Sequence, residues 1–226
     1  MIYSKIIVLF AILATVNYAE VFKPAWNEAG DFLMEQEKVI EHELGKGDSA
    51  HFVMAIAFPE LLRYRMFKDL LETRALELIY VNYGKEAADF SIGPLQMKPS
   101  FAEKIEHVAD SLGVAGSLQI DNPTAKEQRK IRIERLSSFK WQLRYLKVFS
   151  LITARLHSRM FFSRQDKLRF FSAAYNHDFM APSKEISSWS KRCIFPYGVH
   201  YKAEQYCYAD IAVYYYRQKS NPVELP

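Results

Sequence analysis

Three separated segments carry residue types suited either to acid–base chemistry or to sugar binding. The first is Val53-Met-Ala-Ile-Ala-Phe-Pro-Glu60, in which a carboxyl group follows an apolar run. A carboxyl group held among apolar side chains is hard to ionise, so it can donate a proton near neutral pH. The segment is compatible with a general acid at Glu60. Taken alone, it fits an ordinary surface glutamate at a helix end better.

The other two segments supply groups that could bind and orient a sugar. Residues 89–100 form a turn-rich stretch in which Gly93 allows close backbone approach and Gln96 offers both a donor and acceptors. Ala173-Ala-Tyr-Asn176 places small residues beneath Tyr175, whose hydroxyl can bind a carboxylate or a sugar. Both segments also fit structural roles: residues 89–100 fit a loop that leads into a helix, and residues 173–176 fit core packing.

Together and in this order, the three segments resemble the lytic transglycosylases, lysozyme-like enzymes that cleave bacterial peptidoglycan. Met54-Ala-Ile-Ala-Phe-Pro-Glu60 is similar to the family's helix bearing its only catalytic carboxylate. Gly93-Pro-Leu-Gln-Met-Lys-Pro-Ser100 is similar to its loop-to-helix segment, and Ala173–Asn176 to its Ala-Ala-Tyr-Asn segment. The resemblance covers about residues 50–180 and is carried by the order of motifs that are individually weak.

The resemblance implies a mechanism in which Glu60 is the single acid and base. Protonated Glu60 donates to the β-1,4 bond between N-acetylmuramic acid and N-acetylglucosamine, then accepts the C6 hydroxyl proton as a 1,6-anhydro ring closes. The runner-up, a hydrolytic lysozyme, needs a second carboxylate, for which Asp89 is the candidate. No metal or cofactor is expected. The residues expected to bind substrate are Gln96, Tyr175, Ser91, Asn176 and Gly93.

Several departures from the family pattern bear on activity. Leu61 stands where the family has Ser, and Pro94 replaces its Leu. His177-Asp178 replace small residues after the Ala-Ala-Tyr-Asn segment. Residues 61–88 contain an insertion that roughly doubles the usual gap, and Glu77 within it is a rival acid at the family's usual distance before the loop.

Two non-enzymatic functions remain open. The departures favour a non-catalytic envelope protein that binds glycan on the same scaffold. Residues 126–169 carry 13 Lys or Arg against three acids, an excess that could meet a polyanion. Such a run is more often the solvated face of amphipathic helices, and nucleic acid is not the expected partner of an exported chain.

Composition and capping signals predict a single all-α, lysozyme-like domain with an irregular active-site loop and little or no strand. Half of the 226 residues are apolar and only 8 are Gly, so a packed core is expected. Helices are expected up to Gly45, from Asp48 to Pro59, within 61–80, and over Glu204–Gln218. Three capping boxes predict further helix starts, namely Ser100 with Glu103, Thr124 with Glu127, and Ser163 with Asp166.

The amino terminus resembles an export signal. Lys5 precedes an eleven-residue apolar stretch, Ile6–Val16, which is too short for an ordinary membrane span. We expect residues 1–19 to be a signal peptide, with an uncleaved anchor as the runner-up, and residues 20–226 to form the domain. The implied location is a bacterial periplasm or cell envelope, with peptidoglycan strands as partner and a monomeric state.

The two cysteines, Cys193 and Cys207, are 14 residues apart. In an exported protein they can form a disulfide that contributes about 3 kcal/mol by closing the intervening loop. Two buried free thiols explain the same residues, and spacing alone does not decide between them.

Overall fold

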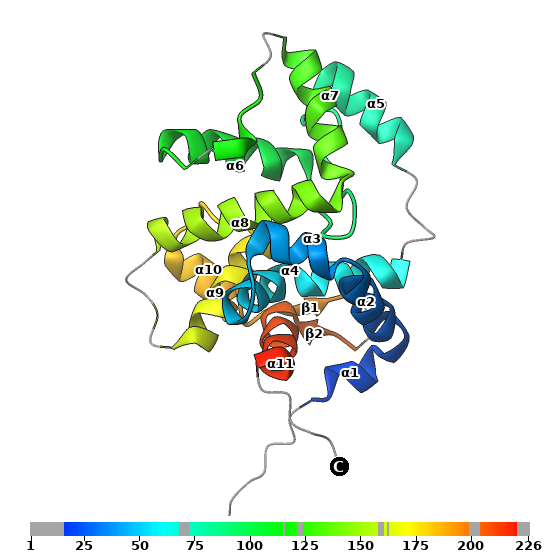
Figure 1. Cartoon of the computed structure of the whole chain (residues 1–226), viewed down its shortest axis with the longest axis vertical. Helices are drawn as coiled ribbons and strands as arrows, with labels where there is room; N and C mark the ends of the chain where they lie inside the picture. The colour runs from blue at the N-terminus through cyan, green and yellow to red at the C-terminus, as the bar shows by residue number, and fades with distance from the viewer. Residues whose placement is uncertain are drawn as a thin grey trace, which may run out of the picture.

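The computed structural model describes residues 16–67, 73–114, 116–121, 124–157, 161, 163–198 and 204–220. Within these ranges the fold is all-α apart from one small antiparallel sheet, which confirms the predicted class (Figure 1). The elements are α1 (Tyr18–Val21), α2 (Lys23–Glu35), α3 (Glu37–Leu44), α4 (Asp48–Phe67), α5 (Arg74–Tyr83), α6 (Pro99–Ser111), η2 (Gly116–Leu118), α7 (Ala125–Leu136), α8 (Phe139–Leu156), α9 (Arg164–Asn176), α10 (Ser183–Trp189), β1 (Cys193–Phe195), β2 (Tyr206–Cys207) and α11 (Tyr208–Ser220).

Helix α4 is the centre of the larger part of the fold and packs against α2, α9 and α11. Its residues from Met54 to Leu62 are all buried, as expected for a helix that is apolar around its whole circumference. The prediction that this helix ends at Pro59 is wrong, because it continues to Phe67. Proline removes one helical hydrogen bond, but here burial on several sides holds the helix together.

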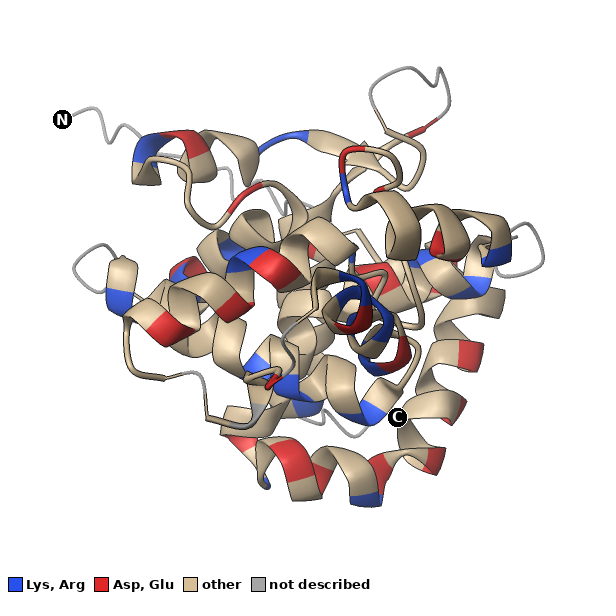
Figure 2. Ribbon diagram, turned by 90° about the horizontal axis from the view of Figure 1, so that it is seen from above, with Lys and Arg blue, Asp and Glu red and all other residues tan. Residues whose placement is uncertain are grey.

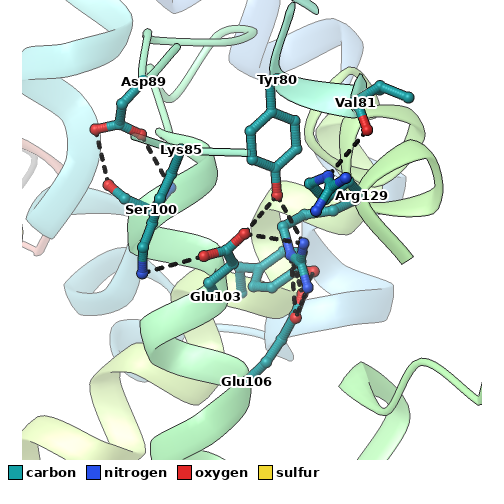
Figure 3. A network of polar contacts seen from close by, with 10 residues as sticks. Tyr80, Val81, Lys85, Asp89, Ser100, Glu103, Glu106 and Arg129 are labelled. Atoms are coloured by element: carbon teal, nitrogen blue, oxygen red, sulfur yellow. Dashed lines mark hydrogen bonds and ion pairs between the residues drawn. The ribbon is translucent and has the colours of Figure 1, made fainter. Parts of the chain in front are cut away.

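The predicted insertion after Glu60 contains α5, which packs against α7 on the far side of α8 from α4 (Figure 1). A polar network joins this part (Figure 3). Arg132 of α7 donates to Tyr80 of α5, and to Glu103 and Glu106 of α6. Tyr145 of α8 also donates to Glu106. Polar groups from four helices are therefore joined in one cluster, with the charged members on α6 and α7.

Two of the three predicted capping boxes give the observed caps. Thr124 accepts the Glu127 amide at 3.3 Å, and Ser163 accepts the Asp166 amide at 3.0 Å. The third prediction is wrong, because α6 begins at Pro99 and places Ser100 inside the helix. Asp89 replaces it as the capping group, reaching across from the preceding loop.

The carboxyl-terminal segment pairs β1 with β2 and then enters α11. Cys193 and Cys207 face each other in this sheet and form a disulfide, which decides between the two alternatives. The predicted helix start at Glu204 is wrong, because residues 206 and 207 pair with β1 and the helix begins at Tyr208.

At the amino end, residues 1–15, which include most of the expected signal segment, lie outside the described residues. The following residues join the core: Tyr18 is buried and meets Tyr206 and Tyr214 edge to face. Cleavage after Ala19 therefore removes a packed tyrosine. No described helix is both long and apolar enough to cross a bilayer.

The described arginines between residues 126 and 169 make contacts within the protein. Figure 2 shows acidic and basic residues interspersed over the helices. Each arginine of this run that the structure describes binds an acid, a hydroxyl or a backbone carbonyl, namely Arg129, Arg132, Arg135, Arg144, Arg155, Arg164 and Arg169. Acids pair with Arg132, Arg144, Arg164 and Arg169, whereas Arg129, Arg135 and Arg155 bind neutral carbonyls and keep their charge.

Candidate active site

A cavity of about 550 Å³ lies between α4, the segment 85–101 and the end of α9. Its wall includes six of the seven residues proposed from the sequence: Glu60, Asp89, Ser91, Gln96, Tyr175 and Asn176. The rival acid Glu77 is not among the lining residues; it lies on α5 and accepts a hydrogen bond from Thr73 at 3.0 Å. The tertiary structure therefore brings the three sequence segments to one place.

Glu60 lies in the middle of α4, with only 5% of its surface exposed. The neighbouring Leu61 is fully buried and points into the core, so the departure from the family's Ser changes the packing beneath the helix. The cavity provides the limited access that the Glu60 side chain has to solvent.

The surroundings of Glu60 are less apolar than the sequence suggested. Arg63, one turn further along α4, places Nη1 at 2.9 Å from Oε1 and 2.7 Å from Oε2. These are the contacts of an ionised carboxylate, whereas a proton donor must be protonated. Sequence reasoning overlooked Arg63 because it placed the helix end at Pro59, and the i, i+3 spacing is meaningful only if the helix continues.

The side-chain amide of Asn176 contacts Glu60 in a fixed orientation. Asn176 Nδ2 donates to Glu60 Oε1 at 3.2 Å, and Asn176 Oδ1 accepts from Trp189 Nε1 at 3.0 Å. An indole nitrogen can only donate, so it must face the oxygen of the amide. The nitrogen is thereby directed to Glu60, and Trp189 of α10 becomes a positioning residue that the sequence did not indicate.

Tyr175 is used differently from what the resemblance implied. Its hydroxyl donates to the backbone carbonyl of Leu95 at 2.8 Å rather than to Glu60. Burial raises the pKa of Tyr175 well above its ordinary value, and the nearby Glu60 charge adds to this rise. Tyr175 therefore remains a neutral donor that ties the loop to α9.

The loop itself is a tight turn closed by Ile92 and Met97, whose backbones exchange hydrogen bonds at 3.0 and 3.1 Å. Gly93 has φ +65°, and a Cβ there would lie 2.5 Å from Gln142 Nε2. Gly93 is therefore required by contact with Gln142, and it does not line the cavity as a ligand-binding residue.

Gln142 of α8 is the fully buried residue that holds this loop. Its Oε1 accepts the Leu95 amide at 2.9 Å, and its Nε2 donates to the carbonyls of Ile92 at 2.6 Å and Leu136 at 2.8 Å. No sequence pattern indicates this role, because a lone glutamine on a helix is usually exposed. With the turn fixed in this way, Gln96 and Ser91 are presented to the cavity.

Asp89 also lines the cavity, but both of its oxygens are engaged. They accept the Ser100 amide at 3.0 Å and the Ser100 hydroxyl at 2.8 Å. This is the capping role that the sequence left open as an alternative to a second catalytic carboxylate.

Phe195 of β1 and Tyr208 of α11 contact the part of α4 that carries Glu60 and Arg63. Phe195 of β1 lies under the Arg63 guanidinium, 5.1 Å from its carbon to the ring centre. Tyr208, the first residue of α11 and the one that follows Cys207, donates through its hydroxyl to the Ile56 carbonyl at 3.3 Å and hydrogen-bonds the backbone amide of Glu60. Burial, followed by the Glu60 charge, raises the pKa of Tyr208 well above its ordinary value. Tyr208 is thus a second positioning residue.

The departures at His177 and Asp178 form part of the same wall. His177 stacks on Trp189 with ring centres 4.1 Å apart, and Asp178 accepts from Lys104 at 2.9 Å. No cluster of His, Cys, Asp or Glu among the described residues is arranged to hold a metal ion. The chemistry that this arrangement can offer is proton transfer through Glu60 to or from a polar ligand.

Comparisons with known proteins give no further assignment. No family model, curated protein or solved structure matches the chain significantly.

Proposed function

We propose that this chain is an exported lytic transglycosylase that cleaves the β-1,4 bond between N-acetylmuramic acid and N-acetylglucosamine. The observation that carries the proposal is the convergence of Glu60, Gln96, Tyr175 and Asn176 on one cavity. These residues come from three segments far apart in the sequence. Glu60 is also the cavity carboxylate that an amide donor and a buried helix hold in place.

In the proposed reaction, protonated Glu60 gives its proton to the glycosidic oxygen, and the bond from that oxygen to muramoyl C1 breaks. The positive charge at C1 is shared with the ring oxygen and the neighbouring acetamido group. The C6 hydroxyl then attacks C1 while its proton returns to Glu60, which yields the 1,6-anhydro product. Asn176 holds the Glu60 carboxyl through both proton transfers.

A hydrolytic lysozyme is the second enzymatic candidate, but Asp89 suits it less because Ser100 occupies both carboxylate oxygens. A non-catalytic glycan-binding protein is favoured by one observation, the Glu60–Arg63 ion pair, which opposes the protonated form that an acid requires. Under each of these proposals the partner is a peptidoglycan strand, the location is the bacterial envelope and the protein acts as a monomer.

The test is to incubate the exported protein with purified sacculi and analyse the released muropeptides by mass spectrometry. We expect anhydro-muropeptides from the wild type and from Glu77→Gln, which alters the rival acid outside the cavity, and none from Glu60→Gln. Products with reducing ends indicate hydrolysis instead. Binding to sacculi without release from the wild type excludes both enzymatic proposals.

A further inference from the structure

Arg63 differs from the other cations of the cavity wall in how its donors are used. Lys85, Lys98 and Lys104 each pair with an acid, at 3.2, 3.8 and 2.9 Å respectively. Arg63 pairs with Glu60 through Nη1, while its buried Nε has no hydrogen-bond partner. That buried Nε is out of reach of a ligand, so a ligand can meet Arg63 only at the terminal nitrogens of its guanidinium, on the cavity side.

The position of Arg63 makes it the first charged group of the pair that a ligand meets. The Arg63 side chain is 27% exposed, compared with 7% for Glu60. Its guanidinium rests against the ring of Phe195, a contact that holds the group without directing any N–H. Both residues line the cavity, so a ligand can reach Arg63 without disturbing α4.

We propose that Arg63 recognises a carboxylate on the glycan, and that this contact releases Glu60 for catalysis. A guanidinium binds a carboxylate through two parallel hydrogen bonds, and the single Nη1 contact to Glu60 does not use that arrangement. When the ligand carboxylate takes Arg63, Glu60 keeps the Asn176 contact and takes up a proton from water. Arg63 stays charged throughout.

This inference rests on the proposed function and specifies its substrate class. The preferred substrate is a glycan with a free carboxylate near the scissile bond, such as the lactyl group of muramic acid in strands without stem peptides. Sacculi, in which peptide-bearing lactyl groups are amides, should be cleaved more slowly. The ion pair that argues against catalysis in the free protein then becomes a contact that only an acidic ligand displaces.

The experiment uses peptide-free glycan strands with free lactyl carboxylates, and the same strands after conversion of those groups to methylamides. Cleavage is measured for the wild type, for Arg63→Met and for Arg65→Met. Arg65 is the matched control, because it lies on the same helix, also has a buried Nε without a partner, and packs on Phe32 away from the cavity.

We expect the wild type and Arg65→Met to cleave the free-carboxylate strands about tenfold faster or more, the effect of losing one charge-assisted contact. In Arg63→Met the preference disappears, and cleavage of the methylamide strands exceeds that of the wild type. Equal cleavage of both strands by the wild type overturns the inference and leaves the proposed function intact.

A binding measurement keeps the inference testable if no cleavage occurs. Calorimetry with Glu60→Gln should show tighter binding of the free-carboxylate strands, and the additional change Arg63→Met should remove the difference. Equal binding of the two strands overturns the inference. Thermal unfolding of each variant shows whether a loss reflects misfolding.

Discussion

Two glutamate–arginine clusters of the fold are built differently, one around Arg132 and one around Arg63. In the interior cluster, Arg132 uses all three of its nitrogens, binding Glu106, Glu103 and Tyr80 across separate helices. In the cavity cluster, Arg63 and Glu60 lie one turn apart on the same helix, and Arg63 Nε has no partner. The contacts of Arg132 join helices that are distant in sequence, whereas the Glu60–Arg63 ion pair lies within one helix.

This difference separates a stabilising role from a chemical one. The contacts of Arg132 with Glu106 raise the pKa of its guanidinium against the opposing effect of burial. In that cluster every nitrogen of Arg132 already donates to a protein partner. The cavity pair contributes less to packing and stays accessible, which suits a group that changes partner or protonation state. Burial of an ion pair is therefore a weaker sign of function than incomplete pairing beside a cavity.

The largest expected effect is that of Arg132→Met on stability. Removing the guanidinium leaves the Glu106 carboxylate, whose side chain is only 15% exposed, without its counter-charge, which should lower the free energy of unfolding by about 3 kcal/mol. The measurement is urea unfolding followed by circular dichroism. Arg63→Met is the comparison, and its loss should be smaller because Arg63 bonds Glu60 on its own helix, whereas Arg132 of α7 bonds residues of α5 and α6. Equal losses would show that the two clusters play the same structural role.

The disulfide should support the cavity cluster and not the interior one. Replacing Cys193 and Cys207 by Ser should lower the free energy of unfolding by about 3 kcal/mol. Because Phe195 ends β1 and Tyr208 follows β2 directly, and both contact the site, we expect loss of muropeptide release as well. Hydrogen exchange should show unchanged amide protection in α5 and α7. Faster exchange there would mean that the two regions are coupled.

Gly93→Ala tests whether the loop is fixed by Gln142. The added Cβ would approach Gln142 Nε2 to 2.5 Å and the Leu136 carbonyl to 2.9 Å, so we expect a loss of about 1 to 3 kcal/mol. Gly84→Ala is the control, because Gly84 also has positive φ but a Cβ there meets only Arg129, at 3.9 Å. The excess loss at Gly93, measured by denaturant unfolding, isolates the steric contact. No excess would show that Gln142 can move away.

The smallest expected effect is that of Trp189→Phe, which removes one N–H and keeps the stacked ring. Without that donor the Asn176 amide can turn its oxygen toward Glu60. We expect kcat to fall severalfold, equivalent to about 1 kcal/mol, with KM and the unfolding midpoint little changed. Trp141→Phe, whose ring lies under Arg135 and Arg144 outside the cavity, should keep full activity. Equal kcat values for the two variants would show that Trp189 does not position Asn176 for catalysis.

Local sequence patterns predicted the helices well where caps and periodicity are decisive. Thr124 and Ser163 cap their helices as expected, since capping depends on residues within one turn. Ser100 did not, because α6 begins one residue earlier and both the amide and the hydroxyl of Ser100 donate to Asp89, eleven residues earlier. The prediction that α4 ends at Pro59 was wrong for a similar reason, since long-range contacts again outweigh a local signal. Packing of α4 against α2, α9 and α11 overrides the usual effect of proline as a helix breaker.

The candidate site divides similarly. Glu60, Gln96, Tyr175 and Asn176 were proposed from motif order, and the structure places all of them on one cavity. The residues that fix them were not found, because Gln142, Trp189 and Tyr208 act through contacts with partners 13 to 152 residues away. No spacing rule links such partners. Gly93 was identified as special, but its physical reason proved to be a side chain of α8.

The sequence by itself determined the all-α class, most helix starts and the residues with suitable chemistry, because these depend on residue type and short-range spacing. Only the tertiary structure decided what surrounds each group. It paired Glu60 with Arg63, oriented Asn176 through Trp189 and turned Asp89 into a cap. The charge state and hydrogen bonding of a side chain depend on distances in space, and those distances are set by the packing of the whole chain.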